Sequence, residues 1–459
     1  MCGVVGIWGH AEAANLAYLG LHALQHRGQE GAGIVSSDGT RLRSLKGRGL
    51  VADVFGDRDE LQQLQGSRAI GHVRYSTTGQ SAEVNVQPLT VQYGAGGLAL
   101  SHNGNFVNAA SLRESLEAEG ALFQSTTDTE VVVHLLARSQ QGSFINRVVD
   151  ALGKLRGAWS LVMLTPDVLV AGRDPLGFRP LVLGRHPGGG WVVCSETCAL
   201  DLIGANYVRD IDPGEIVVID GDGLSSFHPF PKVAPKPCVF EYLYFSRPDT
   251  ALWERDVYGV RMRLGSRLAR EAPCDADMVV PVPDSGVAAA MGYARGLDIP
   301  FELGLIRNHY VGRSFIEPSQ SIRDFGVKLK LNPVPGLLQG KKVVVVDDSL
   351  VRGTTCRKIV RMLRRAGATE VHLRIAAPPT TGSCFYGIDT PNPSELIASR
   401  NEVDEIGRFV GADSISYLSL EGMHEAVGTP AEAHCDACFS GRYPVLHEDL
   451  QRRPQLPLF

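Results

Sequence analysis

The chain has 459 residues, of which 44% are hydrophobic and 21% charged, with nine cysteines and a formal net charge of −5 at pH 7. This length predicts two domains, because one core seldom grows so large, and the acidic balance argues against general nucleic-acid binding, which needs a basic face. The sequence has no apolar run of membrane-spanning length and no signal-like start, so we expect a cytoplasmic protein whose cysteines are thiols or metal ligands.

The chain begins MCGVVGIWGH, which places Cys2 directly after the initiator methionine. One interpretation is that Cys2 opens a buried strand, since Val4, Val5 and Ile7 follow and free cysteine is commonly buried. The other is that removal of Met1 leaves a thiol and a free α-amine on the same residue. The first interpretation is favoured for an isolated cysteine, so the second needs support from the rest of the sequence.

Short apolar or alternating runs, most of them ending in Gly, Asn or Asp, fill the first half of the chain and predict β-strands. They span residues 2–9, 31–39, 69–77, 97–105, 160–166 and 215–220. Helices are predicted over residues 15–28 and 126–139. The apolar face of the first helix consists of Leu16, Leu19, Ala23 and Leu24, with Gly28 as its stop. Strands with interspersed helices, without regular alternation, predict an α+β layered domain.

A proline-rich stretch, FHPFPKVAPKPC at residues 227–238, separates the two halves. Its four prolines exclude a central strand or a helix interior, so it is an extended linker. We therefore place the domains at residues 2–230 and 238–459.

The second half alternates short, fully apolar runs with helices. The runs cover residues 277–283, 341–348 and 370–379, and helical patterns over residues 287–296 and 355–367 follow the first two. Continuous apolar runs are typical of parallel strands buried on both faces. The pattern predicts a doubly wound α/β sheet, in which ligands bind at the carboxyl ends of the strands.

The most specific stretch is VVVVDDSLVRGTTCRKIV at residues 343–360. A buried strand ends in Asp347 and Asp348, and a Ser/Gly/Thr loop then opens a helix whose backbone amides favour a phosphate. The acids suit sugar hydroxyls or a divalent cation. They could instead merely cap the loop, but the ordered combination of strand, acid pair and phosphate loop argues against that.

This stretch resembles the phosphoribosyl pyrophosphate (PRPP) motif of type I phosphoribosyltransferases. The resemblance implies a PRPP site formed by Asp347, Asp348, Ser349, Gly353, Thr354 and Thr355. Residues 279–286, VVPVPDSG, match the pyrophosphate-side loop, where Ser285 would help Asp347 and Asp348 to hold Mg²⁺. Residues 307–330 resemble the family's mobile catalytic loop, whose basic residues, including Arg313, would meet the leaving pyrophosphate.

Four short motifs of the first half, together with Cys2, resemble the glutaminase domain of N-terminal-nucleophile amidotransferases. They are HRGQE at 26–30, GHVRYSTTG at 71–79, SHNGN at 101–105 and STTDTE at 125–130. With both halves in this order, the chain resembles the amidophosphoribosyltransferase family nearly throughout. The resemblance implies an αββα sandwich followed by a phosphoribosyltransferase domain, and an enzyme that converts glutamine and Mg–PRPP to 5-phosphoribosylamine in the first step of purine synthesis.

The resemblance also assigns roles in glutamine hydrolysis. Cys2 is the nucleophile, with its own α-amine as the base, since both groups titrate near neutral pH. Asn103 and the backbone amide of Gly104 form the oxyanion hole. The residues expected to bind glutamine are Arg74 at its α-carboxylate, Asp128 at its α-amine, and Arg27.

The late Cys435-x-x-Cys438 pair taken alone fits half a zinc site, half an iron–sulfur site or a redox pair. Resemblance to the iron–sulfur branch of the family implies a 4Fe–4S cluster held by Cys238, Cys384, Cys435 and Cys438, with zinc as the alternative. The resemblance gives no function to Cys194, Cys198, Cys274 and Cys356, which we expect to be structural. It further implies purine nucleotide inhibitors and a homotetramer.

Two rival functions remain at this stage. Another glutamine amidotransferase, such as a glucosamine-phosphate synthase, is disfavoured because its acceptor domain has no need of the Asp347–Asp348 motif. A PRPP-sensing regulatory protein with an inactive glutaminase half is disfavoured because the glutaminase set from Cys2 to Asp128 is complete.

Overall fold

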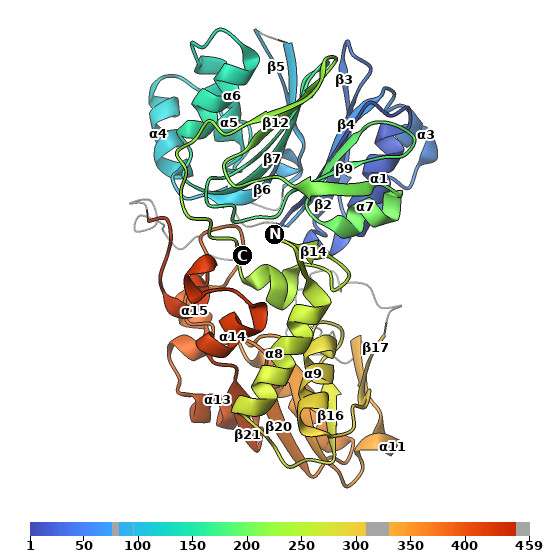
Figure 1. The fold of residues 1–459 in the computed structure, drawn as a ribbon, viewed down its shortest axis with the longest axis vertical. Helices are drawn as coiled ribbons and strands as arrows, with labels where there is room; N and C mark the ends of the chain where they lie inside the picture. Colours follow the sequence, from blue (N-terminus) through green and yellow to red (C-terminus); the bar gives the residue numbers. More distant parts are fainter. Residues whose placement is uncertain (76–81, 95, 309–329, 447–459) are drawn as a thin grey trace.

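The structure is a computed structural model that describes residues 1–75, 82–94, 96–308 and 330–446. It has two lobes, the first half of the sequence in blue to green and the second in yellow to red (Figure 1). The N-terminus lies between the lobes rather than at an outer surface. Residues 309–329, which include Arg313, lie outside the described residues, as does most of the predicted catalytic loop.

Two antiparallel sheets form the first lobe. The seven-stranded sheet consists, in spatial order, of β11 (Asn206–Asp210), β9 (Val182–Arg185), β10 (Trp191–Cys194), β1 (Gly3–Trp8), β4 (Arg68–Arg74), β2 (Gly31–Ser37) and β3 (Leu42–Arg48). The six-stranded sheet consists of β13 (Gly223–Phe227), β12 (Ile216–Asp220), β8 (Leu169–Arg173), β7 (Gly157–Leu164), β6 (Gly96–Phe106) and β5 (Leu89–Tyr93). These strands confirm the six apolar runs read from the sequence.

The alternation of side chains along β1 explains why its run is apolar throughout. Val4 packs into the core between the two sheets, whereas Val5 and Ile7 point to the opposite face, under the helices. Helices cover both outer faces of the sheet pair (Figure 1). They are α1 (Ala13–Ala23), α2 (Val51–Val54), α3 (Arg58–Gln62) and α7 (Thr197–Ile203) on one side, and α4 (Ala109–Ala118), α5 (Glu130–Arg138) and α6 (Phe144–Gly153) on the other. The lobe is therefore the expected αββα sandwich.

The first predicted helix ends earlier than the sequence indicated. α1 stops at Ala23, a 3-10 turn follows over Gln25–Arg27, and Gly28 is extended rather than a left-handed cap. A side chain at Gly28 would lie 2.5 Å from the backbone of Arg74, so this glycine permits a close approach of two chain segments. Leu19, expected on the buried face, is 38% exposed.

A four-stranded parallel sheet forms the centre of the second lobe. Its strands are β16 (Met278–Pro281), β19 (Lys342–Asp347), β20 (Glu370–Ile375) and β21 (Ser414–Tyr417). The helices around it are α8 (Val257–Glu271), α9 (Val287–Leu297), α11 (Pro335–Leu338), α12 (Thr354–Arg365), α13 (Val403–Val410), α14 (Leu420–Val427) and α15 (Ala437–Ser440). Two small antiparallel pairs complete it, β14 (Ala251–Leu252) with β15 (Arg255–Asp256) and β17 (Leu305–Arg307) with β18 (Leu331–Pro333). The predicted α/β phosphoribosyltransferase fold is thus present.

The proline-rich segment between the lobes contains neither helix nor strand over residues 228–237, as predicted. It leads into a π-helical turn, Glu241–Phe245, whose first three residues are buried. Within the described ranges, every helix is too short or too polar to cross a lipid bilayer.

Candidate functional site

Cys2 lies immediately before β1, in the middle of the seven-stranded sheet and close to the boundary between the lobes. Met1 is buried, with 1% of its surface exposed, and the Cys2 thiol donates a 3.6 Å hydrogen bond to the Tyr75 carbonyl. Burial raises the pKa of the Cys2 thiol, against the opposing effects of the chain-terminal amine, the Tyr75 hydrogen bond and Arg74. The resting thiol is therefore neutral and needs a base to become a nucleophile.

Asn103 and Gly104 lie side by side on β6. The Asn103 amide is fully buried, and neither its Nδ2 nor its Oδ1 has a hydrogen-bond partner among the described residues. Leaving a buried amide unpaired is costly, and a ligand or reacting group that binds beside Asn103 would supply a partner. Gly104 has φ +154°, and a side chain there would lie 2.0 Å from the Ala158 carbonyl oxygen. Only glycine fits at this position.

Arg74 and Asp128 place one positive and one negative charge near the Cys2 thiol. They are 5% and 9% exposed. Burial lowers the pKa of Arg74, while the nearby charges of Cys2, Glu30 and Asp128 raise it. Asp128 accepts hydrogen bonds from the Phe106 amide at 2.9 Å and the Thr127 hydroxyl at 3.2 Å. A fixed arginine and a fixed carboxylate beside one thiol suit a ligand that carries both charges, such as an amino acid.

Arg27, the third residue predicted to bind glutamine, has a different environment. Its Nε donates a 2.9 Å hydrogen bond to the Cys2 carbonyl, and its terminal nitrogens donate to the buried carboxylates of Glu196 and Glu241. Its donors are thus directed at protein groups behind the nucleophile. The predicted role in glutamine binding stays a prediction, whereas the observed contacts are those of a residue that holds Cys2.

Glu196, Glu241 and Arg179, which lie around Arg27, were not predicted from the sequence. All three are fully buried. The signal for Glu241 was its place within the apolar, aromatic run VFEYLYF at 239–245, because a buried acid in such a run needs a charged partner. That partner could not be identified without the structure.

The acid pair of the second lobe lies at the carboxyl end of β19, as predicted. Asp347 and Asp348 are 8% and 7% exposed, the Asp348 amide donates to the Asp347 carboxylate at 2.9 Å, and the Ser349 hydroxyl donates to Asp348 at 2.6 Å. Burial, followed by the charge of Asp348, raises the pKa of Asp347 well above its usual value. A cation bound here would relieve this repulsion, so the donor set fits Mg²⁺.

The predicted phosphate loop joins the acid pair to α12. Gly353 has φ +73° and precedes the helix, and Thr354 and Thr355 are exposed in its first turn. The neighbouring loop carries Ser285. The next residue, Gly286, packs so closely that a side chain there would lie 2.6 Å from the Val346 carbonyl oxygen. The structure therefore brings Ser285 to the end of β19 beside the acid pair.

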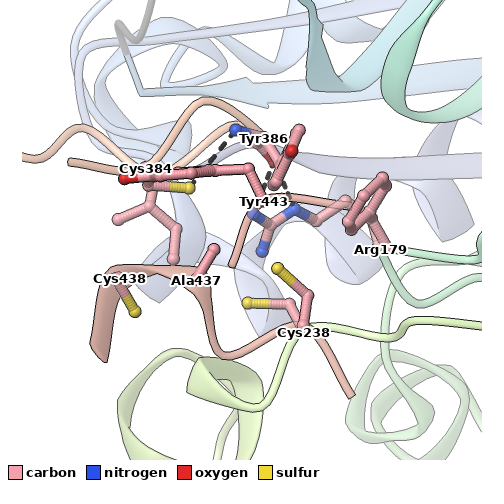
Figure 2. A pocket seen from close by; sticks show the side chains of 10 residues that line it. Arg179, Cys238, Cys384, Tyr386, Ala437, Cys438 and Tyr443 are labelled. Carbon is pink, nitrogen blue, oxygen red and sulfur yellow. Dashed lines mark hydrogen bonds between the residues drawn. The ribbon is translucent and has the colours of Figure 1, made fainter. Parts of the chain in front are cut away.

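The four cysteines predicted to bind a cluster line one cavity in the second lobe, at its boundary with the first (Figure 2). The lining comprises Phe178, Arg179, Cys238, Cys384, Tyr386, Ile388, Cys435, Ala437, Cys438 and Tyr443. Cys238, Cys435 and Cys438 are buried, and Cys384 is partly exposed. Burial raises the pKa of the Cys238 thiol to about 11, against the opposing charge of Arg179.

The spacing of these sulfur atoms bears on which metal they suit. In the described part of the chain, no three cysteine sulfur atoms lie within 4.8 Å of one another. A tetrahedral zinc ion with Zn–S bonds of about 2.3 Å would require sulfur atoms about 3.8 Å apart. Among the described residues, the sulfur atoms therefore do not have the spacing of a closed four-cysteine zinc site. Arg179 donates to the Tyr386 carbonyl beside the cavity (Figure 2).

The remaining cysteines lie elsewhere. Cys194, Cys198 and Cys356 are buried, Cys274 is partly exposed, and all nine cysteines are free thiols. The predicted structural role of these four stays a prediction.

Residues 72–202 match the glutamine amidotransferase domain family, and residues 260–380 match the phosphoribosyl transferase domain family. The chloroplastic amidophosphoribosyltransferase of Glycine max is 56% identical over 453 residues, which cover 98% of this chain and 79% of that protein. The amidophosphoribosyltransferase of Bacillus subtilis strain 168 is 49% identical over 449 residues, covering 97% and 94%.

Solved structures agree with the relatives. The glutamine PRPP amidotransferase of B. subtilis complexed with ADP and GMP has a TM-score of 0.91 at 49% identity, covering 96% of this chain and 97% of that one. A structure described as that of the allosteric regulatory enzyme of purine biosynthesis has a TM-score of 0.92 at 49% identity, with 96% of each chain covered.

Proposed function

The chain belongs to the amidophosphoribosyltransferase family, and from this we propose that Cys2 and the Asp347–Asp348 pair mark its two reaction centres. It is a glutamine amidotransferase and pentosyltransferase, and the reaction is the first step of purine biosynthesis. The regulatory alternative with an inactive glutaminase half is not favoured. We further propose domain boundaries at residues 2–230 and 238–459.

The first centre releases ammonia from glutamine. After removal of Met1, the α-amine of Cys2 takes the thiol proton and the thiolate attacks the side-chain amide carbon of glutamine. The developing oxyanion accepts hydrogen bonds from Asn103 Nδ2 and the Gly104 amide. The proton then goes to the leaving nitrogen, ammonia departs, and water hydrolyses the thioester to glutamate and the free thiol. Arg74 and Asp128 hold the α-carboxylate and the α-ammonium.

The second centre uses that ammonia. Asp347 and Asp348 bind the ribose hydroxyls, and the loop from Ser349 to Thr355, with Gly353 and Thr354 at the helix start, binds the 5′-phosphate. Mg²⁺, held with the help of Ser285 and the acid pair, would offset the charge of the leaving pyrophosphate. The ammonia lone pair forms the bond to the anomeric carbon as the bond to pyrophosphate breaks, which yields 5-phosphoribosylamine. Arg313 is proposed to contact the pyrophosphate.

The observation that carries the glutaminase assignment is the Asn103 amide, fully buried and unpaired within the described residues. A structural asparagine at this depth would be hydrogen-bonded. An oxyanion that exists only during the reaction supplies the acceptor that Asn103 Nδ2 lacks.

We also propose that Cys238, Cys384, Cys435 and Cys438 hold a 4Fe–4S cluster, which the cavity that they line together supports. Purine nucleotides are proposed as feedback inhibitors, because a related structure is complexed with ADP and GMP. A homotetramer in the cytoplasm is our proposed assembly and location, although the plant relatives are named chloroplastic.

The test of the function is pyrophosphate release from Mg–PRPP, measured with glutamine and, separately, with a concentrated ammonium salt. We expect release with both nitrogen sources and glutamate formation only with glutamine. Release with ammonium alone would mean that the transferase half works and the glutaminase half is inactive. No release with either would contradict the proposed function as a whole.

A further inference from the structure

Four charged residues form a fully buried cluster directly behind the nucleophile, and we call it the junction cluster. Its members are Arg27, Arg179, Glu196 and Glu241, none more than 1% exposed. Arg27 pairs with Glu241 at 2.9 Å and with Glu196, and Arg179 pairs with Glu241 at 3.1 Å. Two cations and two anions thus balance one another away from water.

The two lobes contribute unequally to the junction cluster. Arg27, Arg179 and Glu196 belong to the first lobe, whereas Glu241 lies in the π-helical turn that opens the second. That turn is fixed from its own side by the buried Arg261 of α8, which donates to the carbonyls of Tyr242 and Ser246 at 2.8 Å. Glu241 therefore presents a carboxylate, anchored in the second lobe, to two arginines of the first.

One contact joins the junction cluster to the reaction centre. The Arg27 Nε donates to the Cys2 carbonyl at 2.9 Å, while both terminal nitrogens of the same guanidinium donate to Glu241. A planar guanidinium with its other donors fixed has little freedom to turn. The direction of the Cys2 carbonyl, and with it the position of the thiol and the α-amine, follows from where Glu196 and Glu241 hold Arg27, and Glu241 is the partner that the second lobe supplies.

Resting on the proposed role of Cys2, we propose that Glu241 is a positioning residue for the nucleophile. It acts through Arg27 and makes the glutaminase reaction depend on the docking of the second lobe onto the first. Ammonia transfer at the Asp347–Asp348 centre does not use this contact. Glutamine binding by Arg74 and Asp128 does not use it either.

The energetics favour positioning over simple stabilisation. Burial and the charge of Glu196 oppose ionisation of Glu241, but Arg27 and Arg179 more than offset them and hold its pKa below the usual value. Apolar residues of similar size can often replace such a buried ion group with no loss of stability. A network of directed hydrogen bonds fixes one geometry at a reacting residue, whereas apolar packing does not, so the charges serve the geometry of Cys2.

The experiment replaces Glu241 conservatively in the full-length protein. Glu241→Gln keeps the size of the side chain but removes the charge, and we expect kcat for glutamine hydrolysis to fall by roughly 100-fold, as misplacement of a reacting group commonly does. The KM for glutamine and ammonia-dependent pyrophosphate release should be unchanged. Alkylation of Cys2 by a reactive glutamine analogue should slow in parallel with kcat.

A matched control comes from the first lobe, which also holds Cys2. Glu215 is 1% exposed and pairs with Arg209 at 2.6 Å but has no contact with Cys2 or the junction cluster among the described contacts. Glu215→Gln should leave both activities and the alkylation rate at wild-type values. If Glu215→Gln slows Cys2 alkylation as much as Glu241→Gln does, loss of any buried carboxylate charge makes the protein less rigid, and the proposal is wrong.

A double variant separates positioning from stability. Arg27→Met with Glu241→Leu removes one cation and one anion and leaves Arg179 and Glu196, so the junction cluster stays neutral overall, whereas Glu241→Gln leaves two arginines with one carboxylate. The thermal midpoint of the double variant should therefore lie at or above that of Glu241→Gln while glutaminase activity stays low. Recovery of glutaminase together with stability would overturn the proposal, as would wild-type glutaminase activity in Glu241→Gln. If the wild-type enzyme itself hydrolyses no glutamine, it is the proposed function that fails, which keeps the two failures distinct.

Discussion

Replacement of Asn103 by leucine tests the oxyanion hole, because we expect it to lower glutaminase activity and at the same time to raise the stability of the fold. The amide is fully buried with both polar atoms unpaired in the described structure. Leucine has the same number and branching of side-chain heavy atoms as asparagine and no polar atom, so Asn103→Leu removes an unpaired group without opening a cavity. Loss of one oxyanion donor costs about 2.7–4 kcal/mol of transition-state stabilisation, or roughly 10²–10³ in kcat.

Stability should move the other way. An unpaired buried polar group costs about 1–3 kcal/mol, so its removal should raise the free energy of unfolding by an amount of that order. Ammonia-dependent pyrophosphate release should not change, because it takes place in the other lobe. The variant should therefore be nearly inactive with glutamine, fully active with ammonia, and more stable than the wild type.

Asn108 provides the matched control, since it is 5% exposed but fully bonded. Its Nδ2 donates to the Lys154 carbonyl and its Oδ1 accepts from the Arg156 amide, both at 2.9 Å. Asn108→Leu should lose about 1–3 kcal/mol of stability and keep its glutaminase kcat. Glutaminase assays and thermal unfolding of both variants decide the matter. If Asn103→Leu destabilises the protein as Asn108→Leu does, or keeps wild-type glutaminase activity, Asn103 is a structural residue.

Three further predictions concern the other groups. Cys2→Ala should abolish turnover with glutamine but not with concentrated ammonia, and equal loss of both in pyrophosphate-release assays would contradict separate centres. Asp347→Ala or Asp348→Ala should weaken Mg–PRPP binding in titrations and stop turnover with either nitrogen source. Because burial raises the pKa of Asp347, its ionisation costs stability as pH rises, so Asp347→Asn should stabilise the ligand-free protein more at pH 8 than at pH 5 in thermal unfolding. Anaerobically purified protein should be brown with about four iron and four sulfide per chain, and Cys435→Ser should lose both colour and stability; a colourless zinc protein would refute the cluster.

Most of the fold could be predicted from local patterns of apolar residues, because burial of a strand or helix face requires apolar side chains at fixed positions. The run from Val4 to Ile7 is apolar because β1 is covered on both faces, and the valines of β19 are apolar for the same reason. The stop of α1 was wrong because Gly28 serves a contact with Arg74 that lies far away in the sequence. A glycine required for close approach is indistinguishable in sequence from a helix cap.

For the site, too, the residues in local motifs were predictable, whereas those that depend on distant contacts were not. Cys2, Asn103, Gly104, Asp347 and Asp348 stand in short motifs, and the structure places each at a strand end or on the strand that the motif indicated. Glu241 was missed because its partner Arg27 is 214 positions away, and no spacing rule links two such residues. A motif identifies residues that act together within one short segment. The residues that hold a nucleophile in place come from distant segments that pack behind it, so a motif does not contain them.

The junction cluster also changes how the proline-rich seam is understood. Prolines at residues 229–237 indicate a linker, and a linker alone would let the halves separate. Yet the chain re-enters the interior at Cys238, and three residues later Glu241 neutralises arginines of the first lobe. Separation would leave Arg27 and Arg179 short of a carboxylate, and loss of one partner from a buried pair costs about 3–5 kcal/mol. The seam therefore divides two folds but not two independent proteins, and the nucleophile lies where they depend on each other.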